Sequence, residues 1–408
     1  MKFRDYQKEI IDKGVDVLGE HGFVYLAMEV RTGKTLTSLG IAKEMGAKRV
    51  LFITKKKAIS SIESDYKMLK PGFTLDVINY ESVHKIEGSF DLVVLDEAHS
   101  MGAFPKPSKR AKQVKIIILK NDPLVILLSG TPTPESYSQM YHQIYAIPRN
   151  PFRRFINFYR FCDEHVNVTQ RPINGIYIKD YSKGLPSIMD SMQPYFISYS
   201  QKEAGFQVKT NEHILHVKMS PLTYNLAKKL QKNLVVEGKN EVILADTPVK
   251  LMMKLHQIYS GTVKFESGAS KTLDYTKAQF IKDKFKDKKI GIFYKFKEEF
   301  KALKEIFQDN LTTDLKEFVN SKKSIALQII SGREGISLRQ ADCLVYYNID
   351  FSATSYWQSR DRMTTKDRIK NEVYWIFSQG GIEDQIYKAV VNKKDYTLNH
   401  FKKDLLNL

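Results

Sequence analysis

The sequence contains few cysteines and few acidic residues, and it has no long apolar run. Cys162 and Cys343 are the only cysteines in 408 residues, so neither a disulfide framework nor a zinc-binding spacing can be built from them. The nine histidines form no pattern of metal ligands, and we expect no structural metal. No apolar stretch approaches the roughly 18 residues of a membrane span, and the first residues lack the apolar core of a signal peptide. These absences predict an intracellular, cytoplasmic protein in a reducing compartment, with no membrane partner.

The shortage of acidic residues leaves a large positive charge. Lysine and arginine number 64 against 46 aspartates and glutamates, a formal net charge of +18. Such a surplus favours polyanions such as nucleic acid, although solubility alone is an alternative that charge leaves open. Hydrophobic residues make up 42%, which is too many for a disordered chain. We find no internal repeat and no low-complexity tail.

The length predicts two or three domains. The pattern of apolar and polar residues changes twice along the chain. Short apolar runs alternate with helical patterns at first, which indicates an α/β lobe with a largely parallel sheet. Strands are expected at 23–27, 50–54, 75–79, 92–95 and 124–129, and helices at 35–45 and 59–69. A mostly helical middle follows, with a stretch broken by Gly and Pro at 172–186. Alternation then returns, with strands expected at 289–294, 324–330, 343–348 and 372–377.

The predicted plan therefore has three parts, and its fold class is α/β. They are an N-terminal α/β lobe at 1–149, a helical insertion and linker at 150–268, and a C-terminal α/β lobe with a C-terminal helix at 269–408.

The strongest local signal is the segment MEVRTGKT, residues 28–35, which follows an expected strand and opens an expected helix. That context is typical of a phosphate-binding loop, whose backbone N–H groups cradle phosphate oxygens. Lys34 would reach the β- and γ-phosphates, Thr35 would ligate Mg²⁺, and Gly33 would let the backbone come close. Met28 stands where the first glycine of the pattern would be, so a chance GKT is the alternative.

Two further motifs follow expected strands. In VVLDEAH, residues 93–99, Asp96 would hold Mg²⁺ through water and Glu97 would position and deprotonate the attacking water. With Lys34 on a neighbouring strand end, this interpretation is favoured over solvent-facing acids that cap a strand. In LLSGTPTP, residues 127–134, Ser129 and Thr131 could relay the state of the γ-phosphate, or the segment could be a plain strand-to-turn signal.

These motifs, in this order, resemble the superfamily 2 helicases. The second half resembles their Swi/Snf branch, which is DEAH-box-like and translocates on duplex DNA. Further segments match the family's text: FRDYQ (3–7), LFITKKK (51–57), INYESV (78–83), MQPYFISYSQKE (192–203), HVKMSP (216–221), KLMMKLHQIYSG (250–261), IISGREGISLRQAD (329–342), YWQSRDR (356–362) and GGIEDQIYKAVVNKKD (380–395). The resemblance implies two RecA-like lobes, ATP and Mg²⁺ as cofactors, and DNA as the partner, with RNA less favoured.

The resemblance also implies roles for individual residues. The catalytic set would be Lys34, Asp96, Glu97 and the arginine finger Arg362. The nucleotide would contact Gln7, Arg31, Thr32, Gly33, Lys34, Thr35 and Gln358, and Gln358 would share one helix face with Arg362. Coupling between nucleotide and track would use His99, Ser129, Thr131 and Gly335. The DNA backbone would be contacted, without sequence preference, by Thr54, Lys55, Lys56, Gly332, Arg333 and Ser337.

The chain departs from the family's pattern at several points. Thr365 stands where a second arginine of the finger motif is usual, so either Lys366 or Arg368 would substitute for it or hydrolysis would rely on Arg362 alone. Arg31 occupies a position usually given to glycine. The text between residues 307 and 324 is short, so an edge strand of the second sheet is expected to be missing. A basic segment at 104–115 would be either a solvated loop or a loop lying along DNA.

The sequence as a whole predicts an ATP-driven translocase or helicase that moves along DNA, with duplex favoured, in replication, recombination or repair. An RNA helicase is the nearest rival. A degenerate module that binds nucleic acid and uses ATP only as a switch is a second alternative, supported by Thr365. The economy of the chain resembles phage-encoded versions, for which the compartment would be the host cytoplasm.

Overall fold

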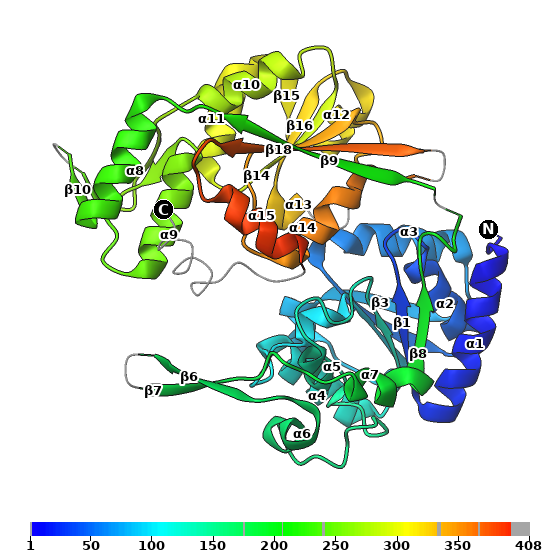
Figure 1. The fold of residues 1–408 in the computed structure, drawn as a ribbon. Coiled ribbons are helices and arrows are strands. Elements are labelled where there is room, and N and C mark those ends of the chain that lie inside the picture. Colours follow the sequence, from blue (N-terminus) through cyan, green and yellow to red (C-terminus); the bar gives the residue numbers. More distant parts are fainter. Residues whose placement is uncertain are drawn as a thin grey trace. The chain divides into compact units, whose positions relative to one another are not determined.

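The chain folds into two compact units, residues 1–206 and 207–408. The computed structural model describes residues 2–173, 176–205, 207–238, 241–332, 336–365 and 368–392 (Figure 1). This division differs from the three parts that the sequence predicted, because the middle segment is shared between the two units. Strand β8 (Phe196–Tyr199) pairs with β1 of unit 1, whereas β9 (Lys209–Val217) pairs with β18 of unit 2. Both pairings join residues far apart in sequence, which local patterns do not reveal.

Unit 1 is built on a six-stranded sheet in the order β3-β2-β4-β5-β1-β8, and every neighbouring pair is parallel. Its other strands are β1 (Phe23–Met28), β2 (Arg49–Thr54), β3 (Thr74–Asn79), β4 (Leu92–Asp96) and β5 (Leu124–Leu128). Its helices are α1 (Asp5–His21), α2 (Lys34–Glu44), α3 (Ile59–Leu69), α4 (Lys109–Asn121), α5 (Met140–Ile144), α6 (Phe158–His165) and α7 (Ser187–Met192). The predicted α/β class is confirmed, and all five strands predicted here are present.

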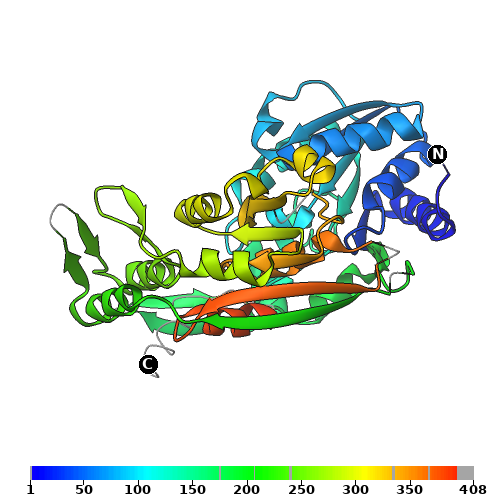
Figure 2. The same cartoon turned by 90° about the horizontal axis from the view of Figure 1, so that it is seen from above.

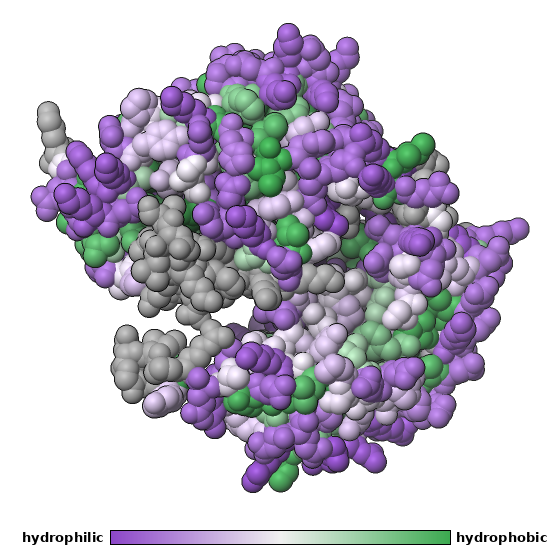
Figure 3. All heavy atoms as spheres, viewed as in Figure 1, coloured by the Kyte–Doolittle hydropathy of each residue, from purple (hydrophilic) through white to green (hydrophobic). Residues whose placement is uncertain are grey.

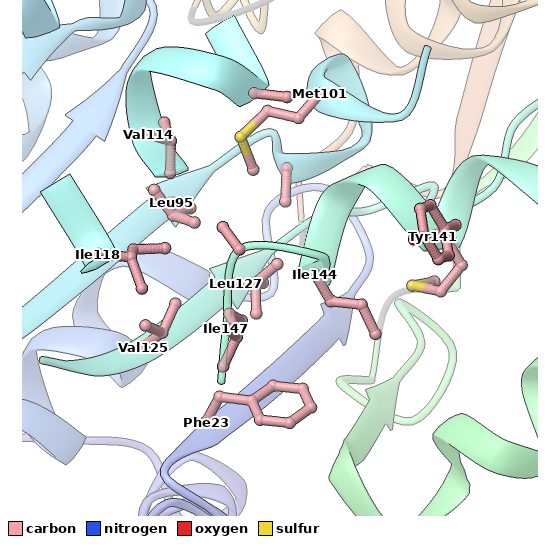
Figure 4. Close-up of a cluster of buried hydrophobic side chains, with 14 of the residues drawn as sticks. Phe23, Leu95, Met101, Val114, Ile118, Val125, Leu127, Tyr141, Ile144 and Ile147 are labelled. Atoms are coloured by element: carbon pink, nitrogen blue, oxygen red, sulfur yellow. The ribbon is translucent and has the colours of Figure 1, made fainter. Parts of the chain in front are cut away.

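Both faces of this sheet are buried, which explains why its strands are continuous apolar runs. Phe23 and Tyr25 of β1 pack into one cluster with α4 and α5, whereas Val24 and Leu26 pack into another with α1, α2 and α3. Figure 4 shows the first cluster, with side chains from β1, β4 and β5 meeting those of α4 and α5. This core fixes the strand ends that carry the motifs.

Two local expectations in unit 1 were wrong. The basic segment 104–115 is only partly a loop, because α4 begins at Lys109, where the side chain of Ser108 accepts a hydrogen bond from the N–H of Ala111 (3.2 Å). Conversely, the helical part of the chain was predicted to begin at residue 150, but the first helix there begins only at Phe158, where the Asn157 side chain caps α6. In both cases a capping side chain sets the first helical residue.

A two-stranded antiparallel ribbon stands in the stretch broken by Gly and Pro, where no strand was expected. It consists of β6 (Thr169–Ile173) and β7 (Ile176–Asp180), which extend away from the rest of unit 1 (Figure 1). A bridge between Val166 and Gly184 closes its base. The sequence did not indicate this ribbon because Pro is uncommon in strands. Pro is accepted mainly at sheet edges, where its position needs no N–H to bond to a neighbouring strand.

Unit 2 contains a second six-stranded sheet, in the order β15-β16-β14-β17-β18-β9, again with only parallel neighbours. Its other strands are β14 (Ile290–Tyr294), β15 (Leu311–Thr312), β16 (Ser324–Gln328), β17 (Cys343–Tyr346) and β18 (Lys370–Ser378). The edge strand predicted to be missing is present, but it has only two residues. Figure 2 shows the long strands β9 and β18 side by side at the other edge.

Helices and two hairpins surround this second sheet. The helices are α8 (Pro221–Asn233), α9 (Pro248–Tyr259), α10 (Thr276–Lys284), α11 (Lys297–Phe307), α12 (Leu315–Asn320), α13 (Ile329–Gly332), α14 (Ala353–Ser359) and α15 (Glu383–Val391). The hairpins pair β10 (Val235–Glu237) with β11 (Val242–Leu244), and β12 (Thr262–Lys264) with β13 (Ser270–Thr272). Helices α8 and α9 lie in the part of the chain that the sequence predicted to be mostly helical.

The face drawn in Figure 3 is largely hydrophilic, as a chain with so many charged residues requires. Within the described ranges, no helix is both long and apolar enough to cross a membrane.

Candidate functional site

The three motifs of unit 1 lie at one edge of its sheet, because the carboxyl ends of parallel strands share an edge. The phosphate-binding loop follows β1, the pair Asp96 and Glu97 closes β4, and Ser129 follows β5. Strand β5 lies between β1 and β4. The strand that precedes Lys34 is therefore not adjacent to the strand that carries Asp96, although the sequence had suggested that the two were neighbours. The motif of Ser129 therefore stands between the lysine and the carboxylates.

The loop between β1 and α2 has the geometry of a phosphate cradle. Helix α2 begins at Lys34, with Thr35 next, and Gly33 caps it with a left-handed φ of 87°. A Cβ at Gly33 would lie 2.5 Å from Gln7 Nε2, so both conformation and space require glycine. Thr32 is fully buried and donates to the carbonyl of Glu29 through its N–H (3.3 Å) and its hydroxyl (2.7 Å). These two hydrogen bonds fix the backbone of the loop between Glu29 and Thr32.

Backbone strain marks the same edge of the sheet. Six described residues other than glycine have a positive φ, and four of them cap the C-termini of helices: Lys70, Asp122, Leu234 and Gln308. The other two are Arg31 (φ 67°) and Glu97 (φ 51°), one in the phosphate-binding loop and one in the carboxylate pair. The left-handed φ of Arg31 explains why glycine is usual there. Strained residues that no cap explains are typical of functional sites.

The two carboxylates are half-buried side by side and carry the same charge. Asp96 Oδ2 accepts a hydrogen bond from the hydroxyl of Thr54 (2.7 Å), and its main-chain carbonyl accepts one from the hydroxyl of Tyr80 (2.6 Å). Burial and the adjacent charge of Glu97 raise the pKa of Asp96 well above the usual carboxyl range, against the opposing effects of Thr54 and Lys34. A divalent cation here would relieve that repulsion.

A chain of short contacts links this pair to the motif after β5. His99 Nδ1 lies 3.3 Å from Glu97 Oε2 and 2.9 Å from Ser129 Oγ. The N–H of Thr131 donates to the same Ser129 oxygen (3.1 Å). The hydroxyl of Thr131 is buried and has no hydrogen-bond partner among the described residues. The structure thus brings together the predicted residues His99, Ser129 and Thr131, and it leaves one buried polar atom for a ligand.

The segment after β8 also supports the phosphate-binding loop, and the sequence did not predict it as part of the site. The Gln201 N–H donates to Glu29 Oε2 (2.6 Å), and its side-chain amide donates to the carbonyl of Val30 (2.8 Å). Tyr199 stacks on Tyr6 with centroids 4.7 Å apart, and the Tyr6 hydroxyl donates to the carbonyl of Thr32 (2.9 Å). The signal for these contacts is a strand pairing that spans about 170 residues, which local patterns do not contain.

Gln7, predicted to contact the nucleotide, lies against the phosphate-binding loop. It is buried, its Oε1 accepts from the N–H of Arg4 (3.0 Å), and its Nε2 lies 3.4 Å from the carbonyl of Gly33. In this structure the Gln7 amide therefore buttresses Gly33.

The predicted DNA contacts have different outcomes. Thr54 is fully buried with its hydroxyl bound to Asp96, so the prediction of a backbone contact through this side chain was wrong. Lys56 is exposed and Lys55 is half-buried, just beyond β2, and Ser337 is exposed. Gly332 is buried, and a Cβ there would lie 2.9 Å from side-chain atoms of Leu327 and Phe293. Arg333 and Gly335 lie outside the described residues.

The finger motif in unit 2 is well ordered by local contacts. Arg362 is buried, its Nε donates to the carbonyl of Gln358 (2.8 Å), and its Nη1 donates to that of Ile336 (3.4 Å). Helix α14 ends at Ser359, so Gln358 and Arg362 meet through a main-chain carbonyl rather than on one helix face. Oε1 of Gln358 is buried without a hydrogen-bond partner among the described residues.

Arg368 does not supply the missing second arginine. Its guanidinium donates to the carbonyls of Ala341 (2.9 Å) and Asp342 (2.9 Å), which ties it to the start of β17. Lys366, the other candidate replacement for Thr365, lies outside the described residues.

The residues of unit 1 fit a nucleoside triphosphate and a divalent cation. The glycine-capped helix start and Lys34 provide donors for phosphate oxygens, and the Thr131 hydroxyl offers a buried donor. Thr35 and Asp96 provide the hydroxyl and carboxylate oxygens that Mg²⁺ prefers. The donor set therefore has the right chemistry for a magnesium nucleotide.

Comparisons with known proteins point the same way. A family model described as the SNF2-related domain matches residues 49–263. The SWI/SNF-related matrix-associated actin-dependent regulator of chromatin subfamily A-like protein 1 of Xenopus tropicalis is 30% identical over 95 residues, 22% of this chain and 10% of that protein. Its Xenopus laevis counterpart is 32% identical over 95 residues with the same coverage. Each match thus spans about a tenth of the relative's length.

Among solved structures, the Sulfolobus solfataricus SWI2/SNF2 ATPase core domain aligns with 96% of this chain and 89% of its own, at 16% identity and a TM-score of 0.43. The family model carries the assignment, since its match covers more than half of the 408 residues. The chain belongs to the family of proteins that share the SNF2-related domain.

Proposed function

We propose that this chain hydrolyses ATP to translocate along duplex DNA, in replication, recombination or repair. The observation that supports this function best is the contact chain from Glu97 through His99 to Ser129 and Thr131, beside the phosphate-binding loop. Hydrolysis alone would need only the loop and the carboxylates. A buried link between two strand ends is what a motor needs to convert nucleotide state into movement.

The loop residues would bind and orient the triphosphate. The N–H groups at the start of α2 and the Lys34 ammonium would hold the phosphate oxygens, while Thr35 and Asp96 would hold Mg²⁺. When bound, the ion supplies positive charge that neutralises the phosphates and the Asp96 carboxylate. Gln201 and Gln7 would keep the loop in shape from outside, because both contact its backbone.

Glu97 would orient the attacking water and accept its proton. Its left-handed backbone redirects the chain directly after β4, and His99 lies within 3.3 Å of its carboxylate. Because His99 also contacts Ser129, movement of the Thr131 loop would be felt at the catalytic carboxylate. Arg362 is proposed as the arginine finger of the same reaction.

The test is the ATPase rate of the full chain with duplex DNA, single-stranded DNA and RNA as separate cofactors. We expect duplex DNA to stimulate most, and Glu97→Gln to lower the stimulated rate by about 10²-fold or more while ATP binding is retained. Glu63→Gln, an exposed acid on α3, is the matched control and should leave the rate unchanged. Arg362→Ala should lower the stimulated rate without changing the fold.

Other outcomes would change the proposal. Equal rates with and without every polynucleotide would exclude a motor, and stimulation by RNA alone would favour an RNA helicase. A wild-type rate for Glu97→Gln would remove the role assigned to that carboxylate.

A further inference from the structure

Glu212, on strand β9 of unit 2, accepts hydrogen bonds from four other side chains. Its Oε1 accepts from the hydroxyl of Tyr356 (2.7 Å) and from Nη1 of Arg360 (2.7 Å). Its Oε2 accepts from Nε1 of Trp375 (2.8 Å) and from the hydroxyl of Tyr387 (3.1 Å). A carboxylate has about four acceptor positions, so these donors use the whole capacity of the group.

The two oxygens of this carboxylate hold different parts of unit 2. The donors on Oε1, Tyr356 and Arg360, belong to α14 and to the turn that follows it, where the finger motif lies. The donors on Oε2, Trp375 and Tyr387, belong to β18 and α15. Trp375 is fully buried, so Oε2 is attached to the core of the unit. Glu212 therefore ties the finger motif to the second sheet and its packed helix.

The contacts of Oε1 lie on both sides of the carbonyl that orients Arg362. The Nε of Arg362 donates to the carbonyl of Gln358 (2.8 Å). Tyr356 precedes Gln358 by two residues, and Arg360 follows it by two. Both flanking side chains donate to the same oxygen of Glu212. The position of this carbonyl, and with it the direction of the Arg362 guanidinium, thus depends on Glu212.

The turn that carries Arg362 needs such side-chain contacts. Helix α14 ends at Ser359, and the next turn, Arg360–Met363, is a 3₁₀ helix. The hydrogen bonds of a 3₁₀ helix have poorer geometry than those of an α-helix, so the backbone alone fixes this turn less firmly. The Arg360 guanidinium lies over the ring of Trp357, 4.1 Å from its centroid, and adds a second contact to the one with the carboxylate.

We propose that Glu212 is a positioning residue for the arginine finger, which holds the turn of Arg362 in the orientation that hydrolysis requires. The proposal rests on the proposed function, since only an ATPase that uses Arg362 needs this turn in one orientation. A carboxylate that merely stabilises unit 2 would make the same contacts. The two roles differ in what a substitution of Glu212 does to the rate when Arg362 is absent.

The test is a double-mutant cycle on the ATPase rate of the full chain. Glu212→Gln keeps the shape of the side chain but removes its charge and replaces one acceptor oxygen by a donor. It should lower kcat by about tenfold or more with the KM for ATP within about twofold, because a finger contributes in the transition state. In the Arg362→Ala background the same substitution should lower the residual rate by less than about twofold, since no finger remains to be positioned.

Two tyrosine variants separate the two oxygens of Glu212. Tyr356→Phe removes a donor from Oε1, on the side of the finger motif, and should lower kcat several-fold. Tyr387→Phe removes a donor from Oε2 and should leave kcat within about twofold, with its effect seen in the midpoint of urea unfolding. Equal losses of kcat in the two variants, or a larger loss for Tyr387→Phe, would contradict the role given to Oε1.

Glu372→Gln is the matched control. The side chain of Glu372 is 21% exposed against 15% for Glu212, so the two carboxylates are similarly buried. Its partners Asn211, His213 and Lys370 lie on β9 and β18, away from the finger motif. This variant should keep the wild-type kcat, and a loss as large as that of Glu212→Gln would show that any carboxylate of this strand pair affects the rate.

Further outcomes would overturn the proposal. A wild-type kcat for Glu212→Gln would show that the finger does not depend on this carboxylate. An equal loss in the Arg362→Ala background would show that Glu212 acts on the fold alone, and a wild-type rate for Arg362→Ala would remove the finger itself. An ATPase that no polynucleotide stimulates would instead overturn the motor function, and the same cycle on the unstimulated rate would still decide the role of Glu212.

Discussion

The half-buried carboxylates of the unit 1 site and two buried ion pairs of unit 2 have different surroundings. In unit 2, Glu383 pairs with Lys277 (2.8 Å) with both side chains fully buried, and Asp350 pairs with Lys295 (2.9 Å). Burial alone would raise the pKa of Asp350, yet Lys295 and Ser355 hold it below its usual value. In unit 1, by contrast, burial and the charge of Glu97 outweigh the interactions that lower the pKa of Asp96, and that pKa is raised.

The difference separates two uses of buried charge. A carboxylate whose pKa falls on folding contributes to the stability of the protein that holds it. A carboxylate whose pKa rises costs stability until a cation arrives, which is the property that a magnesium site requires. The two left-handed residues at the unit 1 site, Arg31 and Glu97, add strain of the same kind.

The largest effect is expected when the lysine of the buried pair in unit 2 is removed. Lys277→Ala should destabilise unit 2 by about 3–5 kcal/mol, because Glu383 would be left buried without its cation. Both tryptophans, Trp357 and Trp375, belong to unit 2, so urea denaturation followed by tryptophan fluorescence reports this unit.

The control is the double variant Lys277→Met/Glu383→Gln. It should recover a large part of the loss, since no charge remains buried. Additive losses in the two single variants would show that the pair carries no coupling energy, and the contrast between the units would lose its main support.

The opposite result is expected at the unit 1 site. Asp96→Asn removes the charge that burial and Glu97 oppose, so it should stabilise the nucleotide-free chain by about 1 kcal/mol while lowering ATP turnover by about 10²-fold. Hydrogen exchange of the amides in β4 and β5 would report the stability of this unit separately. Loss of protection there would mean that Asp96 is structural, like Asp350.

The elements that the sequence predicted well are those whose determinants are local. Strands β1, β4 and β5 are continuous apolar runs, and the phosphate-binding loop is a short pattern between a strand and a helix. The order in which the motifs follow their strands then places them at one edge. The site could therefore be predicted to this extent without coordinates.

What the sequence could not provide depends on contacts between distant residues. Thr54 ends an apolar strand, and only the position of Asp96 on the adjacent strand turns its hydroxyl inward. Gln201 reaches Glu29 because β8 pairs with β1. The Pro-containing strand β6 is recognisable as a strand only through its pairing with β7. The alternation of apolar and polar residues along a strand does not identify its pairing partner, so these features could be seen only in the folded structure.

A smaller effect is expected from a carboxylate of unit 2 that lies beside the first residues of α8 and α10. Asp274 accepts hydrogen bonds from the N–H of Ser220 (2.8 Å), the Thr223 hydroxyl (2.7 Å) and the N–H of Thr276 (2.9 Å). Burial would raise the pKa of Asp274, but these bonds outweigh it and lower the pKa to about 2. Since the folded pKa is depressed, the stability from Asp274 is present above the unfolded value near 3.8 and is lost as pH falls towards about 2.

Asp274→Asn should therefore cost on the order of 2 kcal/mol at neutral pH. The difference from wild type, followed by tryptophan fluorescence, should be constant between about pH 5 and 8 and shrink below about pH 4. A difference that stays the same down to pH 3 would show that the charge of Asp274 does not matter, and only its hydrogen bonds do.

The smallest effect concerns the strain in the phosphate-binding loop. Arg31→Gly relieves the left-handed φ of 67° but gives the unfolded chain more freedom, so the stability of unit 1 should change by less than about 0.5 kcal/mol. Arg31→Ala keeps the strain and removes the guanidinium. If that group contacts the nucleotide, both variants should weaken ATP binding several-fold, whereas a purely conformational role predicts changed binding for Arg31→Gly alone, because alanine keeps the same strain as arginine. Titration of a fluorescent ATP analogue distinguishes the two, and equal binding by all three proteins would place Arg31 outside the nucleotide site.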